Sequence, residues 1–303
     1  MADGTFVAPW GEELSKTDVY SGRNGRVVKS NELIQQSIYN LSLVQQKIIL
    51  YVISMLRPYQ LELSEVSFSI REFCDVAGLT PTDGNIAGSI YRSIKDAIMD
   101  IRNRAIWLEK PDGSITTTSW VNKATIHKNS GTITIIIDED LKEQLLNLTE
   151  YFTQYELLYV MNFKSKYTIR LYEYISSLLF DKRKTYTKRC TVEELRKRTG
   201  VDSGGTGARQ KASTEGGQIY PQYRDFKRRV LAPAVIEINQ YSDKVVTFEE
   251  VTQGRKVVAV MLTIREKTLE ERLAATKRVY DRLDGQTSVF GESNNVTEGG
   301  NNE

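Results

Sequence analysis

Apolar residues recur with helical spacing in three stretches of the chain. Residues 43–56 form a nearly continuous apolar run that follows a possible capping box beginning at Ser42 and that ends before Pro58. In residues 85–104, isoleucines every three or four positions mark one helix face, and residues 167–178 show the same spacing. We therefore predict a long helix in each of these three ranges.

Two shorter segments, 68–79 and 190–201, match position by position at a fixed offset of 122 residues. Each begins with a hydroxyl residue that can cap a helix, has a glutamate three places later, and ends with a glycine that can terminate the helix. These residues are Ser69, Glu72 and Gly78 in the first copy, and Thr191, Glu194 and Gly200 in the second. A short capped helix that glycine ends and another helix follows is the first half of a helix-turn-helix, so the repeat predicts two such units.

β-Branched segments follow each helical unit. In the first unit, residues 105–109 and 132–137 predict strands of one hairpin-type sheet. In the second unit, residues 245–248 and 257–264 predict a hairpin with its tip near Gly254. Three helices followed by a β-hairpin describe a winged helix. The predicted fold class is therefore α+β, with two tandem winged-helix domains, each a helix-turn-helix plus a β-hairpin wing.

The composition suggests where these domains begin and end. We predict a flexible N-terminal arm at 1–27, a first winged-helix domain at 28–150 and a second at 151–268, followed by a C-terminal helix and disordered tail at 269–303. Within the second domain, the Gly-rich and Ser-rich residues 202–217 predict a long flexible loop before its last helix.

The net charge of +2 conceals a strongly basic segment. Residues 161–230 contain 17 Lys and Arg against 7 Asp and Glu, whereas the rest of the chain carries 24 basic and 32 acidic residues. A basic segment on an acidic chain favours a polyanionic partner, and the alternative is a solvated lysine-rich surface. The two cysteines lack metal-ligand spacing, and neither a signal pattern nor a long apolar span is present. We expect a cytoplasmic protein with no membrane partner.

Residues 220–239 form the most informative basic segment. Pro221 suits the start of a helix, an apolar residue at every fourth position from Phe226 predicts a buried face, and Arg224 and Arg228 lie on another side. In a helix-turn-helix this helix enters the major groove, where the arginine fork matches O6 and N7 of guanine. We expect Pro233 to kink the helix beyond the reading region.

From these patterns we predict the residues that contact DNA, with the second domain as the main base reader. They are Ser89, Arg92 and Lys95 in the first domain, and Lys166, Lys188, Arg189, Lys197, Tyr223, Arg224, Lys227, Arg228, Arg229, Arg255 and Lys256 in the second. The alternative for this set is a basic, solvated helix and its surroundings.

Catalytic chemistry has little support in the sequence. His127 is the single histidine, so a paired-histidine metal site is impossible. The acidic residues 138–140 could hold a metal, but Asp140 also suits a cap of a helix at 141–148. The glycines at 204–207 lack the Gly-Lys-Ser/Thr ending of a phosphate loop. We expect no catalytic residue, no metal and no cofactor, although an enzyme acting on DNA remains a third interpretation.

Several segments also resemble a known family. Asn31–Ile34 with Leu41–Tyr51, Ser165–Tyr174 and Asp225–Asn239 are similar, in order, to motifs of the plasmid replication initiators of the Rep_3 (RepB/RepE-like) superfamily. The resemblance covers roughly residues 28–266. It implies a tandem winged-helix protein that binds direct repeats, called iterons, at a plasmid origin. It also implies origin opening, recruitment of a host initiator protein and replicative helicase, and repression of the protein's own gene by a homodimer on an inverted repeat.

The resemblance leaves a transcriptional repressor without a replication role as the alternative function. It also implies two oligomeric states, and the apolar strand 132–137 suggests where the dimer forms. This strand is apolar on both predicted faces, so we expect a partner to cover it and Ile135→Glu to favour the monomer.

Overall fold

The computed structural model describes residues 6–7, 13–14, 25–56, 60–79, 87–110, 112–127, 130–179, 185–202 and 219–291. Most of the predicted arm, the loop at 203–218 and the tail at 292–303 lie outside the described residues. Near the N-terminus, β1 (Phe6–Val7) pairs with β2 (Glu13–Leu14).

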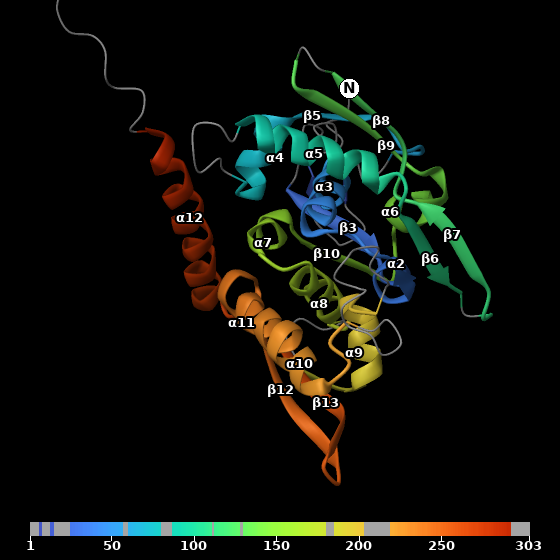
Figure 1. Ribbon diagram of the computed structural model, residues 1–303, viewed down its shortest axis with the longest axis vertical. Helices are drawn as coiled ribbons and strands as arrows, with labels where there is room; N and C mark the ends of the chain where they lie inside the picture. Colours follow the sequence, from blue (N-terminus) through green and yellow to red (C-terminus); the bar gives the residue numbers. More distant parts are fainter. Residues whose placement is uncertain are drawn as a thin grey trace, which may run out of the picture.

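The N-terminal half contains helices and two small three-stranded sheets (Figure 1). Its elements are β3 (Arg26–Ser30), α2 (Asn31–Gln36), β4 (Ser37–Ile38), α3 (Leu43–Ser54), β5 (Val66–Ser69), α4 (Ile70–Ala77), α5 (Ala87–Ile101), β6 (Ala105–Glu109), β7 (Ile115–Ser119), β8 (Val121–His127), β9 (Thr132–Ile137), a 3-10 turn (Glu139–Leu141) and α6 (Lys142–Leu145).

The C-terminal half repeats the order of helices followed by a hairpin. Its elements are β10 (Phe152–Glu156), α7 (Leu157–Asn162), α8 (Lys166–Ser176), β11 (Tyr186–Thr191), α9 (Val192–Thr199), α10 (Tyr223–Phe226), a π-helical turn (Lys227–Leu231), α11 (Ala232–Tyr241), β12 (Lys244–Gln253), β13 (Lys256–Glu266) and α12 (Leu269–Gly291). The long β12–β13 hairpin projects from this half as the wing, and β11 pairs with β13 (Figure 1).

The repeated caps form as predicted. The Ser69 hydroxyl accepts a hydrogen bond from the backbone N–H of Glu72 at 3.0 Å, and Gly78 ends α4 with φ +61°. In the second copy the Thr191 hydroxyl accepts from the N–H of Glu194 at 3.0 Å, and α9 ends in the same left-handed way. These contacts span three residues, which is why a local pattern could predict them.

The strand pairing of the N-terminal half differs from the prediction. Residues 105–109 and 132–137 do not share a hairpin, because β6 pairs with β7 and β4, whereas β9 lies between β5 and β8. The polar, threonine-rich stretch 115–119 forms an additional strand. Its weak apolar alternation gave no signal of a partner.

Strand β9 lies between two other strands and has one face in the core, so it is not apolar and uncovered on both faces. Its side chains alternate: Ile133, Ile135 and Ile137 are buried in the core, and the other face is half-buried. On that second face, the hydroxyls of Thr134 and Ser67 lie 2.8 Å apart. Ile135 therefore supports the fold of the single chain, so its substitution would disturb that fold; dimerisation through this sheet stays a prediction.

The two halves share a strand pair and buried polar contacts. Strand β10 is antiparallel to β3, and the Lys29 ammonium on β3 lies 2.8 Å from the Glu173 carboxylate on α8, with both side chains buried. Arg170 on α8 donates to the carbonyls of Ser37 at 3.0 Å and Arg198 at 3.2 Å. The β3–β10 pairing and the contacts of Lys29 with Glu173 and of Arg170 with Ser37 cross the predicted boundary at 150, which stays a prediction.

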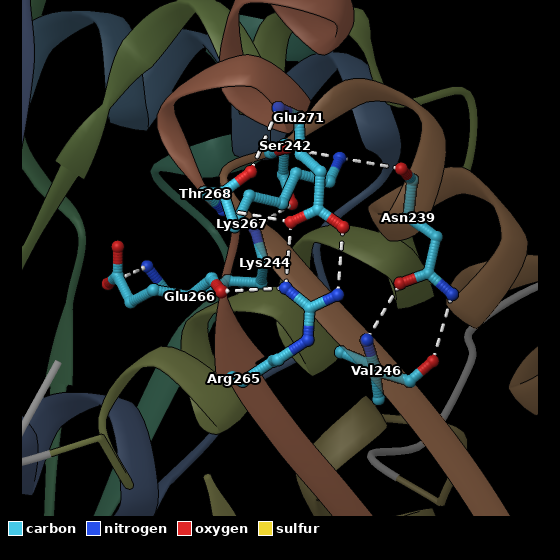
Figure 2. Close-up of polar contacts among 9 residues, drawn as sticks. All are labelled: Asn239, Ser242, Lys244, Val246, Arg265, Glu266, Lys267, Thr268 and Glu271. Atoms are coloured by element: carbon cyan, nitrogen blue, oxygen red, sulfur yellow. Dashed lines mark hydrogen bonds and ion pairs between the residues drawn. The ribbon is translucent and has the colours of Figure 1, made fainter. Parts of the chain in front are cut away.

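The start of α12 is held against the second half (Figure 2). Thr268 and Glu271 exchange reciprocal hydrogen bonds of 2.8 and 3.3 Å in a capping box, and Glu271 also makes a bidentate ion pair with Arg265 at 2.7 and 2.8 Å. Lys267 donates to the carbonyls of Asn239 at 2.6 Å and Ser242 at 2.7 Å, which joins α12 to the end of α11. The helix α12 begins at Leu269, within the predicted C-terminal segment. Among the described helices, none combines the length and apolarity needed to cross a bilayer.

Candidate nucleic-acid interface

The last helix of the second helix-turn-helix begins at Tyr223 and continues through α10, the π-helical turn and α11. As predicted, its apolar stripe faces the core; the buried residues are Phe226, Val230, Ala234 and Ile238. Pro233 has no N–H to donate to the carbonyl of the residue four positions earlier. In a regular α-helix the proline ring would also clash with that carbonyl. The π-helical turn ends at Leu231, two residues before this proline. The irregularity therefore lies within the predicted contact residues 227–229 and not beyond them.

The arginines of this helix are exposed but differ in their surroundings. The Arg224 side chain makes no hydrogen bond or ion pair with any residue that the structure describes, and it is exposed. Arg228 lies 2.9 Å from the Asp225 carboxylate one turn earlier. The Arg229 guanidinium lies over the Tyr220 ring, 5.3 Å from its centroid. Of the three, Arg224 is the side chain most available to a ligand.

A carboxylate that sequence reasoning missed connects this helix to the wing. Glu250 on β12 accepts a hydrogen bond from the Tyr223 hydroxyl at 3.0 Å and lies 2.7 Å from the Lys227 ammonium. The hydrogen bond from Lys227 is the main cause of the lowered pKa of Glu250. Two predicted DNA contacts are thus held by the wing strand. No local pattern marks Glu250, because its partner Tyr223 lies 27 residues earlier in the chain.

Arg255 and Lys256 are exposed at the tip of the wing, as predicted. Gly254 has φ +62° in the turn between β12 and β13, a conformation that residues with a side chain rarely adopt. A groove separates α9 from the start of α10 and from β13, and Tyr223, Arg224, Arg255 and Lys256 line it. The helix end and the wing therefore present their cations on one concave surface.

Four other predicted contacts in the second half have different positions. The Lys197 ammonium binds both oxygens of Glu109, at 2.7 and 2.6 Å, so it joins α9 to β6 of the other half. Lys166 donates to the Asn40 side chain at 2.9 Å, and burial lowers its pKa. Lys188 lies 3.4 Å from Glu194, whereas Arg189 is exposed. Lys197 lines the groove, but the structure does not bring Lys166 to it.

In the first half, α5 occupies the position of the corresponding helix. Arg92 is exposed on it and Lys95 is half-buried, while the side chain of Ser89 lies outside the described residues. The buried side contains Ile94, Ile98 and Ile101, in agreement with the predicted stripe. Whether these three predicted contact residues bind DNA stays a prediction.

The acidic segment after β9 forms a cap. Asp138 is the capping residue instead of Asp140: its carboxylate accepts from the N–H of Asp140 at 3.2 Å and from the Ser119 hydroxyl at 2.6 Å. The following α6 is shorter than the predicted helix at 141–148. Within the described part of the chain, no three His, Cys, Asp or Glu side chains form a group that could hold a metal ion. His127 is exposed, and residues 204–207 lie outside the described residues.

Comparisons with known proteins agree with this architecture. The family described as "Initiator Replication protein, WH1" matches residues 26–176, and the one described as "Initiator Rep protein, WH2" matches residues 191–264. The crystal structure of Pi initiator protein in complex with iteron DNA is similar, with 18% identity and a TM-score of 0.62 over 81% of this chain and 98% of that chain. The WH1 domain of MSBI1.176, a replication protein isolated from a multiple sclerosis patient, has 20% identity and a TM-score of 0.27, over 34% and 78% of the two chains. Two winged-helix domains in tandem are thereby confirmed.

Proposed function

Because the chain belongs to the Rep3 family of replication initiator proteins, we propose that it binds specific double-stranded DNA and initiates replication of the molecule that carries the binding sites. The observation that carries this proposal is the groove lined by Tyr223, Arg224, Arg255 and Lys256. In winged-helix and helix-turn-helix proteins, the start of this helix contacts base edges in the major groove. Exposed wing cations are well placed for phosphates.

Two further observations support double-stranded DNA as the ligand. The excess of basic residues lies within 161–230, the segment that includes α8, α9 and α10. The similar Pi initiator protein has been crystallised with iteron DNA. We therefore infer that this chain binds direct repeats at an origin, with the second domain as the main base reader.

The later steps of initiation are part of the proposal. Family membership supports opening of the adjacent DNA, recruitment of the host initiator protein and replicative helicase, and repression of the protein's own gene from an inverted repeat. We propose that the protein does this without catalytic residues of its own. The alternative is a winged-helix repressor with no role in replication, which the same groove would serve equally well.

Self-association requires a surface other than the buried face of β9. We propose the edge of β7, which pairs only with β6 among the described strands and carries neither charge nor proline, the usual protection of a sheet edge. Ile115 and Trp107 are 61% and 48% exposed on one face of this hairpin. Ile115→Lys should shift the protein toward monomer in sedimentation, and unchanged sedimentation would exclude this edge.

Selection of duplexes from a randomised library by the full-length protein tests DNA recognition. We expect recovery of one motif, and that motif should occur as tandem copies beside the gene. A second assay places the gene and its flanking DNA on a plasmid that cannot otherwise replicate. Replication that a frameshift in the gene abolishes supports an initiator. A recovered motif without replication supports the repressor, and no motif at all rejects sequence-specific binding.

A further inference from the structure

Arg196 in the last turn of α9 is buried, although it lies in a basic run where a solvated side chain would be ordinary. Its guanidinium donates to both carboxylate oxygens of Asp202, at 2.9 and 2.6 Å. It also donates to the backbone carbonyls of Tyr220 at 2.6 Å and Ile219 at 2.9 Å. The same group lies over the Phe226 ring, 5.6 Å from its centroid. One side chain thus makes four hydrogen bonds and one ring contact.

These partners belong to both ends of the connection between α9 and α10. Asp202 follows the glycine that ends α9, and Ile219 and Tyr220 lead into α10 at Tyr223. Because the Asp202 carboxylate and the Ile219 carbonyl are both within 2.9 Å of Arg196 Nη2, the two ends meet on one guanidinium.

The lead-in segment, residues 219–222 before α10, needs such support. Tyr220 has φ +56°, a left-handed conformation that is unfavourable for a residue with a β-carbon and that persists when surrounding contacts hold it. Its carbonyl is one of the Arg196 acceptors, and its ring lies below Arg229. Three residues later Tyr223 begins the helix that carries Arg224. Movement of the lead-in would therefore move Arg224 relative to the wing.

We propose that Arg196 is the positioning residue for base reading: it fixes Tyr223 and Arg224 against α9 and the wing, independently of the length of residues 203–218. This inference rests on the proposed DNA-binding function. The planar fork is essential to it, because one lysine ammonium cannot satisfy a bidentate carboxylate and two carbonyls in the same directions. Arg196 is buried, so we assign it no direct contact with DNA.

The test uses full-length Arg196→Lys, with Asp202→Glu as the conservative control, and duplexes selected by the wild-type protein from a randomised library. The readout is the ratio of affinities for the selected duplex and for the unselected pool. We expect Arg196→Lys to lower this ratio about 10-fold, the scale of one lost bidentate base contact, with pool affinity and salt dependence unchanged. Asp202→Glu should keep most of the ratio. A selection repeated with Arg196→Lys should recover a motif with weaker base preference, at the same base positions where Arg224→Ala weakens it.

Two results would overturn the proposal: an unchanged ratio in Arg196→Lys, or an equal loss for selected and unselected DNA. A second variant replaces residues 204–217 with a six-residue Gly-Ser linker and keeps Arg196 and Asp202. It should retain the wild-type ratio, and a loss there would assign positioning to the connection itself, even if Arg196→Lys fails to fold. Failure of the wild-type protein to select any motif would instead reject the proposed function.

Discussion

Arg224 offers the sharpest test of base reading, because its replacement by alanine removes no side-chain hydrogen bond or ion pair with the described residues. The side chain is exposed, so Arg224→Ala should change the free energy of unfolding by less than about 0.5 kcal/mol. If Arg224 makes a bidentate contact with guanine, its loss should cost about 1–3 kcal/mol of binding to selected duplexes, or roughly 5- to 150-fold in Kd. Affinity for unselected DNA should change little.

The surroundings of Arg228 and Lys256 provide matched comparisons. Arg228 already pairs with Asp225 at 2.9 Å on an exposed surface, and such a pair is worth about 0.3–0.5 kcal/mol. The net contribution of Arg228 to DNA binding should therefore be smaller than that of Arg224 by about that amount. Lys256 at the wing tip should contact phosphate. Lys256→Ala should weaken binding to selected and to unselected DNA equally, and it should reduce the slope of log Kd against log salt by about 1.

Fluorescence anisotropy of labelled duplexes at several salt concentrations measures the affinities and the salt slope. Thermal unfolding verifies that each variant is folded. Base reading by Arg224 is refuted if Arg224→Ala, like Lys256→Ala, lowers the affinity for selected and for unselected DNA by the same factor. That result would mean that the helix starting at Tyr223 contacts the backbone of DNA and does not read bases.

Three other predictions follow from charges in the structure. If the basic segment 161–230 makes six to ten phosphate contacts, log Kd should change with log salt at a slope of magnitude about 5–9, and a slope near 1 would exclude DNA as the ligand. Glu109→Gln releases Lys197 from its ion pair, so affinity for unselected DNA should rise and the salt slope should steepen by about 1; an unchanged slope would show that Lys197 does not reach DNA. Burial lowers the pKa of Lys47 from 10.5 to about 8, so between these values the unfolded state binds more protons than the folded state and this group makes stability rise with pH. In denaturant titrations from pH 8 to 9.5, Lys47→Met should show a smaller rise than the wild type, and an equal rise would contradict the lowered pKa.

The helices and their ends were predictable because their causes are local. The caps at Ser69 and Thr191 act on the N–H three residues later, and the apolar stripe of α11 repeats along one helix. The exposed position of Arg224 and the wing tip at Gly254 follow from the same kind of pattern. For these features the residues that decide the structure are close together in the chain.

The pairing of strands was not predictable in the same way. Residues 132–137 are apolar enough to suggest two covered faces, yet β9 is flanked by β5 and β8 and buries only alternate side chains. The π-helical turn also lies earlier than Pro233 suggested, because the chain adjusts before the residue that lacks the N–H. The strand pairing depends on neighbours that the local pattern does not identify, whereas the position of the turn depends on how the chain adjusts to Pro233.

Local sequence patterns were sufficient to predict the tandem order of helix-turn-helix and wing, the capped helices, and the basic character of the segment that we propose as the DNA reader. Which cations are available to a ligand depends on packing that these patterns do not contain. Lys197 pairs with Glu109, and Arg196 is buried between two ends of a connection, although both lie in one basic run with Arg198. A local pattern reports helix faces and total charge. It does not identify partners that come close only when the chain folds, such as Glu109 of the other half for Lys197, or Ile219 and Tyr220 for Arg196.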